Sequence, residues 1–183
     1  MEHQTALDRT RRWIASMVIG LNLCPFAQRV FVGDKIRYVV VDATNEAALL
    51  KELANELKML SAAPIETVET TLLIHPYVLG DFLDYNDFLD RAEEQLETLG
   101  LSGIIQIASF HPNYQFADTE PDAVENFTNR SPYPMLHLLR EESIDASADD
   151  EEALLDIPRR NIETLRALGR DRIDSMFKHI DDV

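Results

Sequence analysis

Three short apolar runs, separated by two long helical stripes, constrain the fold of this chain most strongly. The runs are rich in β-branched residues, as buried strands are, and they cover residues 36–41, 70–74 and 104–110. Between them, apolar residues recur every three or four positions over residues 45–61 and 81–99, as on one face of a helix. Helices of this length can serve as crossovers between parallel strands. We therefore predict an α/β fold with a short, mainly parallel sheet, built on a β-α-β-α-β core and flanked by helices.

Further elements are predicted before this core. An apolar stripe over residues 5–22 predicts an N-terminal helix, which Pro25 would end. Residues 29–32 predict a hairpin arm or a strand with a short lead-in to the first run.

Helices are also predicted after the core. Ser131 and Pro132 resemble an N-cap and a first helical residue, so we predict a helix over residues 132–143. A C-terminal helical segment begins at Pro158. Residues 144–156 carry acidic groups and no basic one, which predicts a mobile acidic link within a single domain of 183 residues.

The charge and the cysteine content narrow the class of protein. The chain has 17 Lys and Arg against 33 Asp and Glu, a net charge of −16. Binding to nucleic acids or anionic membranes needs clustered cations, so we predict neither. The single Cys24 excludes an internal disulfide and a CxxC site. Residues 11–27 resemble a secretory signal, but Asn22 interrupts the apolar run and no cleavage motif follows, so we predict a cytoplasmic protein.

A polar side chain follows each of the three predicted parallel strands. These residues are Asp42, His75 and His111. Because ligands of open α/β sheets bind outside the carboxyl ends of the strands, we predict a catalytic site that uses these three groups. The alternative is structural: Asp42 would cap the following helix, and each histidine would fill a turn at a strand end.

The segment 110–142 is the densest in functional residue types. A loop of about twenty residues in a compact domain is unusual unless it is functional or disordered. Arg130, just before the predicted helix, suits a bidentate clamp on a carboxylate or phosphate, with Arg140 supporting it. Alternatively, Arg130 pairs with an acidic residue or with loop carbonyls and holds residues 112–130. The other predicted substrate-binding residues are Asn129, Tyr114 and Gln115.

His137 is the fourth predicted catalytic residue. It lies four positions before Glu141, and on a helix this spacing suits a metal site or a general base oriented by a carboxylate. A surface ion pair, or a buried histidine satisfied by Glu141, is the alternative. His75, His111 and His137 would together make a three-histidine metal site, but nothing local enforces it. We predict no bound metal, and the sequence identifies no cofactor.

Cys24 stands among apolar neighbours. A lone cysteine in such a setting is usually a small buried hydrophobe, so we expect it to be largely buried and slow to react. Its alternative role is a nucleophile served by a histidine.

Six segments together resemble a known family. They are LNLCPF (21–26), RYVVVDAT (37–44), TLLIHP (71–76), DFLDYNDFLD (81–90), IASFHPNYQF (107–116) and TNRSPYPMLHLLRE (128–141). The chain is similar, over nearly its whole length, to the bacterial domain-of-unknown-function family 1415. The resemblance implies no activity. It implies that loop 110–141 belongs to the family pattern, with motif positions at Cys24, His75, His111, Asn129, Arg130, His137, Arg140 and Glu141.

Two functions remain open at this point. The first is an intracellular enzyme that acts on a small anionic metabolite at the carboxyl edge of the sheet, where Arg130 binds the anion and His111 or His137 moves a proton. The second is a non-catalytic ligand-sensing or protein-interaction domain that uses the 112–137 loop. An enclosed polar pocket would favour a small ligand, and an exposed apolar patch would favour a protein partner. The oligomeric state cannot be predicted.

Overall fold

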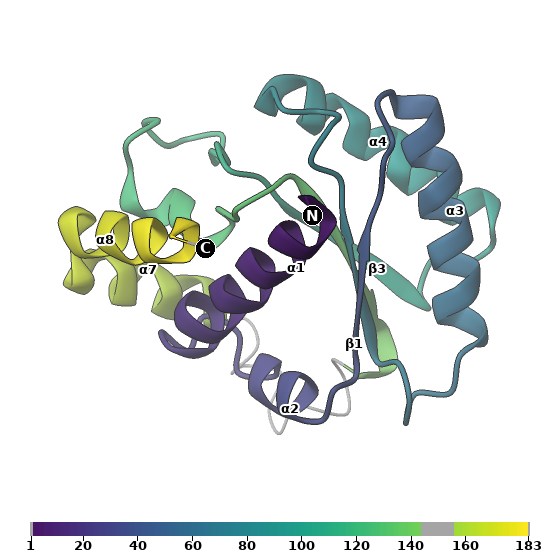
Figure 1. Ribbon diagram of the computed structural model, residues 1–183, viewed down its shortest axis with the longest axis horizontal. Helices are drawn as coiled ribbons and strands as arrows, with labels where there is room; N and C mark the ends of the chain where they lie inside the picture. The colour runs from purple at the N-terminus through teal and green to yellow at the C-terminus, as the bar shows by residue number, and fades with distance from the viewer. Residues whose placement is uncertain (1, 144–155, 183) are drawn as a thin grey trace.

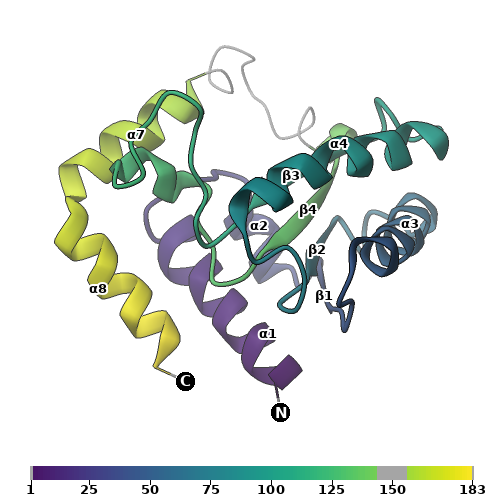
Figure 2. The ribbon, with the colours of Figure 1, turned by 90° about the horizontal axis from the view of Figure 1, so that it is seen from above.

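The computed structural model describes residues 2–143 and 156–182, and it shows one sheet with helices on both faces (Figures 1 and 2). The predicted acidic link at 144–156 lies outside the described residues, apart from Asp156. The described residues contain no helix that is both long and apolar enough to cross a membrane.

The sheet has four strands in the order β1-β2-β4-β3, and it is mixed. The strands are β1 (Ile36–Val40), β2 (Thr70–Ile74), β3 (Ile105–Phe110) and β4 (Met135–Arg140). β1 and β2 pair in parallel, whereas β4 is antiparallel to both of its neighbours. The α/β class is confirmed, but the prediction of a mainly parallel sheet was wrong. The difference arises because β4 lies between β2 and β3.

β4 occupies residues that were predicted to form a helix. Leu136 and Leu138 face one hydrophobic cluster, whereas Met135 faces the other. Because both faces of the strand are covered, apolar residues occur on both, and the period of two that marks a half-exposed strand is lost. Pro134 lacks an N–H, and its carbonyl accepts a hydrogen bond from the backbone N–H of His75 at 3.0 Å. The chain thus enters β4 in extended form.

The N-terminal helix is confirmed, with an unexpected change of winding. α1 (Glu2–Trp13) continues directly into a π-helical segment, η1 (Ile14–Ile19). Residues 29–32, predicted as a strand, belong instead to a short helix, α2 (Ala27–Val32). The β-branched residues of α2 favour a strand, but the segment winds as a helix that a local turn closes. The backbone N–H of Lys35 donates to the carbonyl of Val30 at 3.1 Å, just before β1 begins.

Two long helices cover one face of the sheet, on the right of Figure 1. They are α3 (Glu46–Ala62) and α4 (Phe82–Thr98), and both were predicted to within about two residues. The side chain of Asn45 caps α3, and that of Asp81 caps α4, each by accepting a backbone N–H. Gly100 follows α4 with a φ of +67°, the left-handed conformation that ends helices and favours glycine.

The other face is covered by the N-terminal helix and by the C-terminal part of the chain. α1 and η1 lie against the sheet, while α7 (Ile157–Leu168) and α8 (Arg170–Asp181) pack outside them (Figure 2). A 3-10 turn, η2 (Val124–Thr128), packs on α7. The side-chain amide of Asn161 donates to the carbonyl of Leu23 at 2.9 Å, in a buried contact between α7 and the segment after η1. Through this packing α1 and α8 come to lie beside each other.

Candidate functional site

The carboxyl edge of the sheet holds Asp42, His75 and His111, but in different surroundings. β1, β2 and β3 run in one direction, so all three residues follow strand ends at that edge. Asp42 is exposed, and its carboxylate contacts Nε2 of His3 at 2.6 Å. It does not cap α3, a role that Asn45 takes. His75 and His111 are fully buried.

The two buried histidines hold the loop between β2 and α4. Nδ1 of His75 donates to the carbonyl of Val78, and Nε2 of His111 donates to that of Leu79, both at 3.1 Å. Nδ1 of His111 accepts the backbone N–H of Asn113 at 3.0 Å, which fixes its neutral tautomer. Leu79 has a φ of +59°, a costly conformation for leucine that these bonds help to maintain. Burial lowers the pKa of His75 to about 4 and also lowers that of His111. Both imidazoles are therefore neutral structural groups.

His137 lies on the opposite face of the sheet. It is aligned with Leu72 of β2, on the face covered by α1. The hydroxyl of Thr70 donates to the carbonyl of Leu138, so it accepts the Nε2–H of His137 at 2.7 Å. Burial lowers the pKa of His137 to about 4. In a strand, four residues span about 13 Å, so the predicted pairing with Glu141 on one helix face was wrong.

The structure does not bring the three histidines together. Side chains alternate between the two faces of the sheet, so His137 projects away from the ring of Tyr85. That ring contacts both His75 and His111, with centroid distances of 5.9 and 5.1 Å. Within residues 2–143 and 156–182, no group of three His, Cys, Asp or Glu side chains could hold a metal ion.

Arg130, the predicted clamp, holds the long loop. Its Nε donates to the carbonyl of Tyr114 at 3.2 Å and its NH2 group to that of Pro121 at 2.7 Å. Its guanidinium also lies over the ring of Phe127, 4.5 Å from the centroid. Burial lowers the pKa of Arg130, and neighbouring Arg170 adds to this effect. Of the two roles left open by the sequence, the structure shows contacts of the loop-holding kind.

The other predicted substrate-binding residues also make internal contacts. The side-chain amide of Asn129 donates to the carbonyl of Ser109 at 3.0 Å, and that of Gln115 donates to Thr119 at 2.6 Å. The ring of Tyr114 packs against Phe82 and Phe116. Arg140 is buried, and its guanidinium donates to the carbonyls of Leu60 and Ala63 at the end of α3 and to that of Val68 just before β2.

A crevice of about 490 Å³ lies at the carboxyl edge between β1 and β2. It is lined by Thr44, Asn45, Glu46, Ala47, Val78, Leu79, Gly80, Asp84 and Arg91. Arg91 is the one cationic side chain in this lining, and it forms an ion pair with Glu46. The carboxylate of Asp84 therefore gives the crevice a net negative charge. The crevice is where an α/β sheet would place a ligand, but its charge does not favour an anion.

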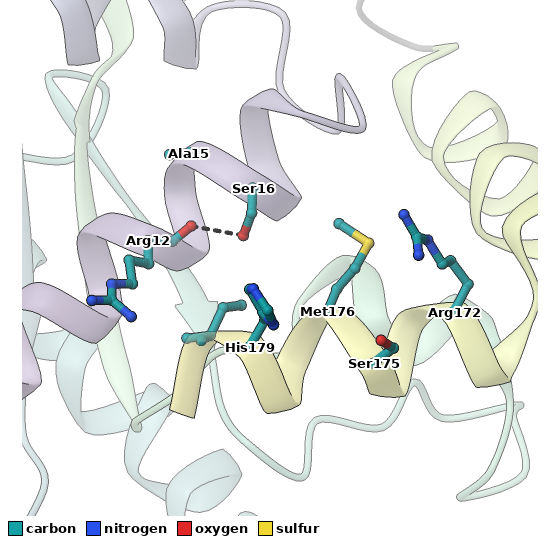
Figure 3. Close-up of a pocket in the computed structure, with 8 residues that line it drawn as sticks. Arg12, Ala15, Ser16, Arg172, Ser175, Met176 and His179 are labelled. Carbon is teal, nitrogen blue, oxygen red and sulfur yellow. Dashed lines mark hydrogen bonds between the residues drawn. The ribbon is translucent and has the colours of Figure 1, made fainter. Parts of the chain in front are cut away.

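A larger groove of about 580 Å³ lies between the N-terminal helix and α8 (Figure 3). One wall consists of Arg12, Ala15 and Ser16, from the junction of α1 and η1; the other consists of Arg172, Ser175, Met176, His179 and Ile180 of α8. Figure 3 shows the side chains of Arg172, Met176 and His179 rising from α8 toward η1. π-Helical turns occur frequently at functional sites.

The groove is cationic although the chain as a whole is acidic. Among the described residues that line it are two arginines and a histidine, and none of these lining residues is a carboxylate. Among the described residues Arg172 makes no hydrogen bond or ion pair. Within the part of the chain that the structure describes, the guanidinium of Arg12 donates only to the backbone carbonyl of Asp182, at 3.4 Å. The backbone carbonyl of Arg12 accepts the hydroxyl of Ser16. Both guanidinium groups therefore retain donors for a ligand.

Sequence reasoning missed this groove. The only signal was the spacing of Arg172, Ser175 and His179, which places polar groups on one face of α8. That face becomes the wall of a groove only when α8 packs beside α1, whose contacting residues lie about 160 positions earlier in the sequence. His3, the partner of Asp42, was also missed, because no local pattern links the two residues.

Comparison with known proteins identifies the family. The search of curated proteins and the search of solved structures both returned no match. The family described as "Protein of unknown function (DUF1415)" matches residues 5–175. The matched range includes Arg12, Ser16, Arg172 and Ser175, and ends just before Met176. The chain thus belongs to the DUF1415 family.

Proposed function

We propose that the protein binds a small anionic molecule in the groove between α1, η1 and α8. The proposal rests on one observation: Arg12 and Arg172 stand on opposite walls of a groove whose described lining holds no carboxylate, in a chain of net charge −16. In such a chain most arginines are neutralised by acidic neighbours, as Arg159 is by Asp156 and Glu163. Guanidinium groups without such partners are suited to carboxylates and phosphates.

The position of α8 adds to the attraction for an anion. Arg172 lies in the first turn of α8, where the helix dipole is positive. The hydroxyl of Ser175 lies one turn further along the same wall and can donate to a bound oxygen. Water reaches the groove, so each contact is weaker than it would be in a closed cavity.

The polar contacts favour binding over catalysis. A nucleophilic serine needs a base within hydrogen-bond reach. The hydroxyl of Ser16 donates instead to the carbonyl of Arg12 at 2.7 Å, and among the described residues His179 makes no hydrogen bond to either serine. The groove therefore supports a ligand-sensing role, the second of the functions considered from the sequence, at a place other than the 112–137 loop.

A thermal-shift titration tests the proposal. Phosphate, citrate and short carboxylates should raise the melting temperature of the full chain, and the shift should grow with the logarithm of the ligand concentration once that concentration exceeds the Kd. Arg172→Gln should abolish that shift while leaving the melting temperature of the free protein nearly unchanged, because Arg172 is exposed and makes no hydrogen bond or ion pair among the described residues. Arg159→Gln removes the same charge from an exposed arginine away from the groove and is the control for a general effect of net charge on the shift. Identical shifts in all three proteins would refute the proposal.

An enzyme at the carboxyl edge is the second candidate. It is favoured by the pair of Asp42 and His3, in which a carboxylate at the end of β1 orients an imidazole that solvent can reach. Asp42→Asn should then abolish the thermal shift given by a ligand of this edge, and Arg172→Gln should leave that shift intact. If every ligand that stabilises the wild type also stabilises Asp42→Asn, this candidate is excluded.

A further inference from the structure

The groove has cationic groups at both ends. Arg172 and His179 are seven residues apart on α8, so they share one face and lie about 10 Å apart along the helix axis. Arg12 is near the His179 end, because its guanidinium donates to the carbonyl of Asp182, just after α8. Figure 3 shows Arg12 beside His179 and Arg172 at the far end. A ligand lying along the groove would thus meet a guanidinium at each end.

The middle of the groove is apolar. Ala15 contributes from η1, and Met176 contributes from α8 between the two cationic ends. Met is a flexible side chain that adapts to irregular apolar ligands. Ser175 is the polar group in this stretch of α8, and Ser16 is already bonded to the carbonyl of Arg12. A polyanion with charge along its whole length, such as a polyphosphate, would place charged groups against Ala15 and Met176, whose side chains offer no hydrogen bond and no opposite charge.

From this pattern we infer that the groove takes an elongated dianion with an apolar middle, of the class of straight-chain dicarboxylates. The inference rests on the proposed anion-binding function and names the chemistry of its ligand. One carboxylate pairs with Arg12 and receives a further hydrogen bond from His179, and the other pairs with Arg172. The methylene chain between them covers Met176 and Ala15. A dicarboxylate too short to reach both ends engages only one arginine.

Calorimetric titration of the full chain tests the ligand class. The probes are succinate, suberate and sebacate, with octanoate as a monocarboxylate that matches suberate in chain length. Suberate or sebacate should bind about tenfold or more tightly than both octanoate and succinate, which is the effect of one additional charge-assisted contact. Arg172→Gln should reduce suberate to the affinity of octanoate. Arg12→Gln should weaken suberate to a similar degree, and Arg159→Gln should change nothing.

The possible outcomes separate the two claims. If octanoate binds as tightly as suberate and both depend on Arg12, the dianion inference is overturned and the anion-binding function stands. If phosphate and citrate bind in an Arg172-dependent way but suberate does not, the inference is overturned in the same manner. If none of these anions binds, the proposed function fails and the inference fails with it. Circular dichroism of each variant confirms that a lost affinity is not lost folding.

Discussion

The guanidinium of Arg130 donates to the carbonyl oxygen of Pro121, nine positions earlier in the chain, at 2.7 Å. The same group donates to Tyr114 and stacks on Phe127, so one side chain connects three parts of the segment after β3. A second residue stabilises the same loop from within. The buried side chain of Asn126 accepts from Phe116 and Thr119 and donates to the carbonyl of Glu120. The loop is therefore ordered by its own polar contacts.

Replacing Arg130 by lysine should lower stability rather than ligand binding. A lysine is a point charge that cannot reproduce the planar fork over Phe127 while donating to two carbonyls. We expect the free energy of unfolding to fall by about 1–3 kcal/mol, the usual effect of losing such hydrogen bonds. Denaturant titration measures this loss, with Arg159→Lys as the control. A stable variant that had lost its anion-induced thermal shift would return Arg130 to the role of ligand clamp.

The sequence predicted the elements whose signals are local. The runs that became β1, β2 and β3, and the stripes that became α3 and α4, each bury residues against the nearest elements, so composition and period were sufficient. β4 could not be recognised in this way, because Leu136 and Leu138 face one cluster and Met135 the other. An apolar run covered on both faces looks the same whether it forms a helix or a strand.

The candidate site was beyond sequence reasoning for a different reason. Asp42, His75 and His111 do lie at the carboxyl edge, as the sequence predicted. The planar guanidinium of an arginine, however, can bind backbone carbonyls as well as it binds an anionic ligand, and Arg130 and Arg140 bind backbone carbonyls. The groove depends on the packing of α8 against α1. No spacing within either helix reveals that Arg12 and Arg172 line the same cavity.

Tyr85 joins α4 to both β3 and β4 through its hydroxyl, and removal of this hydroxyl alone should lower the free energy of unfolding. The hydroxyl of the buried Tyr85 donates to the carbonyl of Met135 at 2.8 Å in a buried contact, and it accepts the backbone N–H of the half-buried Phe110 at 3.0 Å. Tyr85→Phe leaves both backbone groups without this partner, so we expect a loss of about 2–4 kcal/mol in the free energy of unfolding. Tyr77→Phe, at an exposed hydroxyl, should cost less than about 0.5 kcal/mol. Equal losses in the two variants would contradict this account of Tyr85.

Stability should fall as the pH falls below about 6.5. The folded-state pKa values of His75 and His137 are lowered to about 4, and that of His111 is lowered as well. Between pH 6.5 and 4 the unfolded chain therefore binds protons that the folded chain excludes, so folding is progressively disfavoured as the pH decreases. Each fully excluded proton contributes about 1.4 kcal/mol per pH unit. Denaturant titrations at several pH values measure the slope. A flat profile over this range would be inconsistent with neutral buried histidines.

Cys24 should be a slow nucleophile. The residue is half-buried rather than largely buried as predicted, and this burial raises the pKa of its thiol despite hydrogen bonds from the backbone of Phe26 and Ala27. Because the thiolate is the reactive form, labelling by a disulfide reagent at neutral pH should be much slower in the native protein than in the denatured chain. Native labelling as fast as that of a free thiol would instead make Cys24 a candidate nucleophile.

A side chain at Gly20 should both destabilise the protein and change the shape of the groove. Gly20 closes the π-helical turn through a hydrogen bond from its N–H to the carbonyl of Ala15 at 3.1 Å. A Cβ at this position would lie closer than 3.0 Å to the backbone oxygen of Ser16, in a helix whose backbone cannot move aside independently. Gly20→Ala should therefore cost about 2 kcal/mol or more in the free energy of unfolding, as other steric conflicts in packed regions do. It should also weaken anion binding, because Ser16 and Arg12, whose carbonyl the hydroxyl of Ser16 contacts, line one wall of the groove.

Gly80→Ala places its Cβ in open space and is the matched control, expected to change the free energy of unfolding and the affinity for the anion little. Denaturant titration and suberate calorimetry on the two variants give both readouts. If Gly20→Ala is destabilised but binds suberate like the wild type, the π-helical turn supports the fold without shaping the groove.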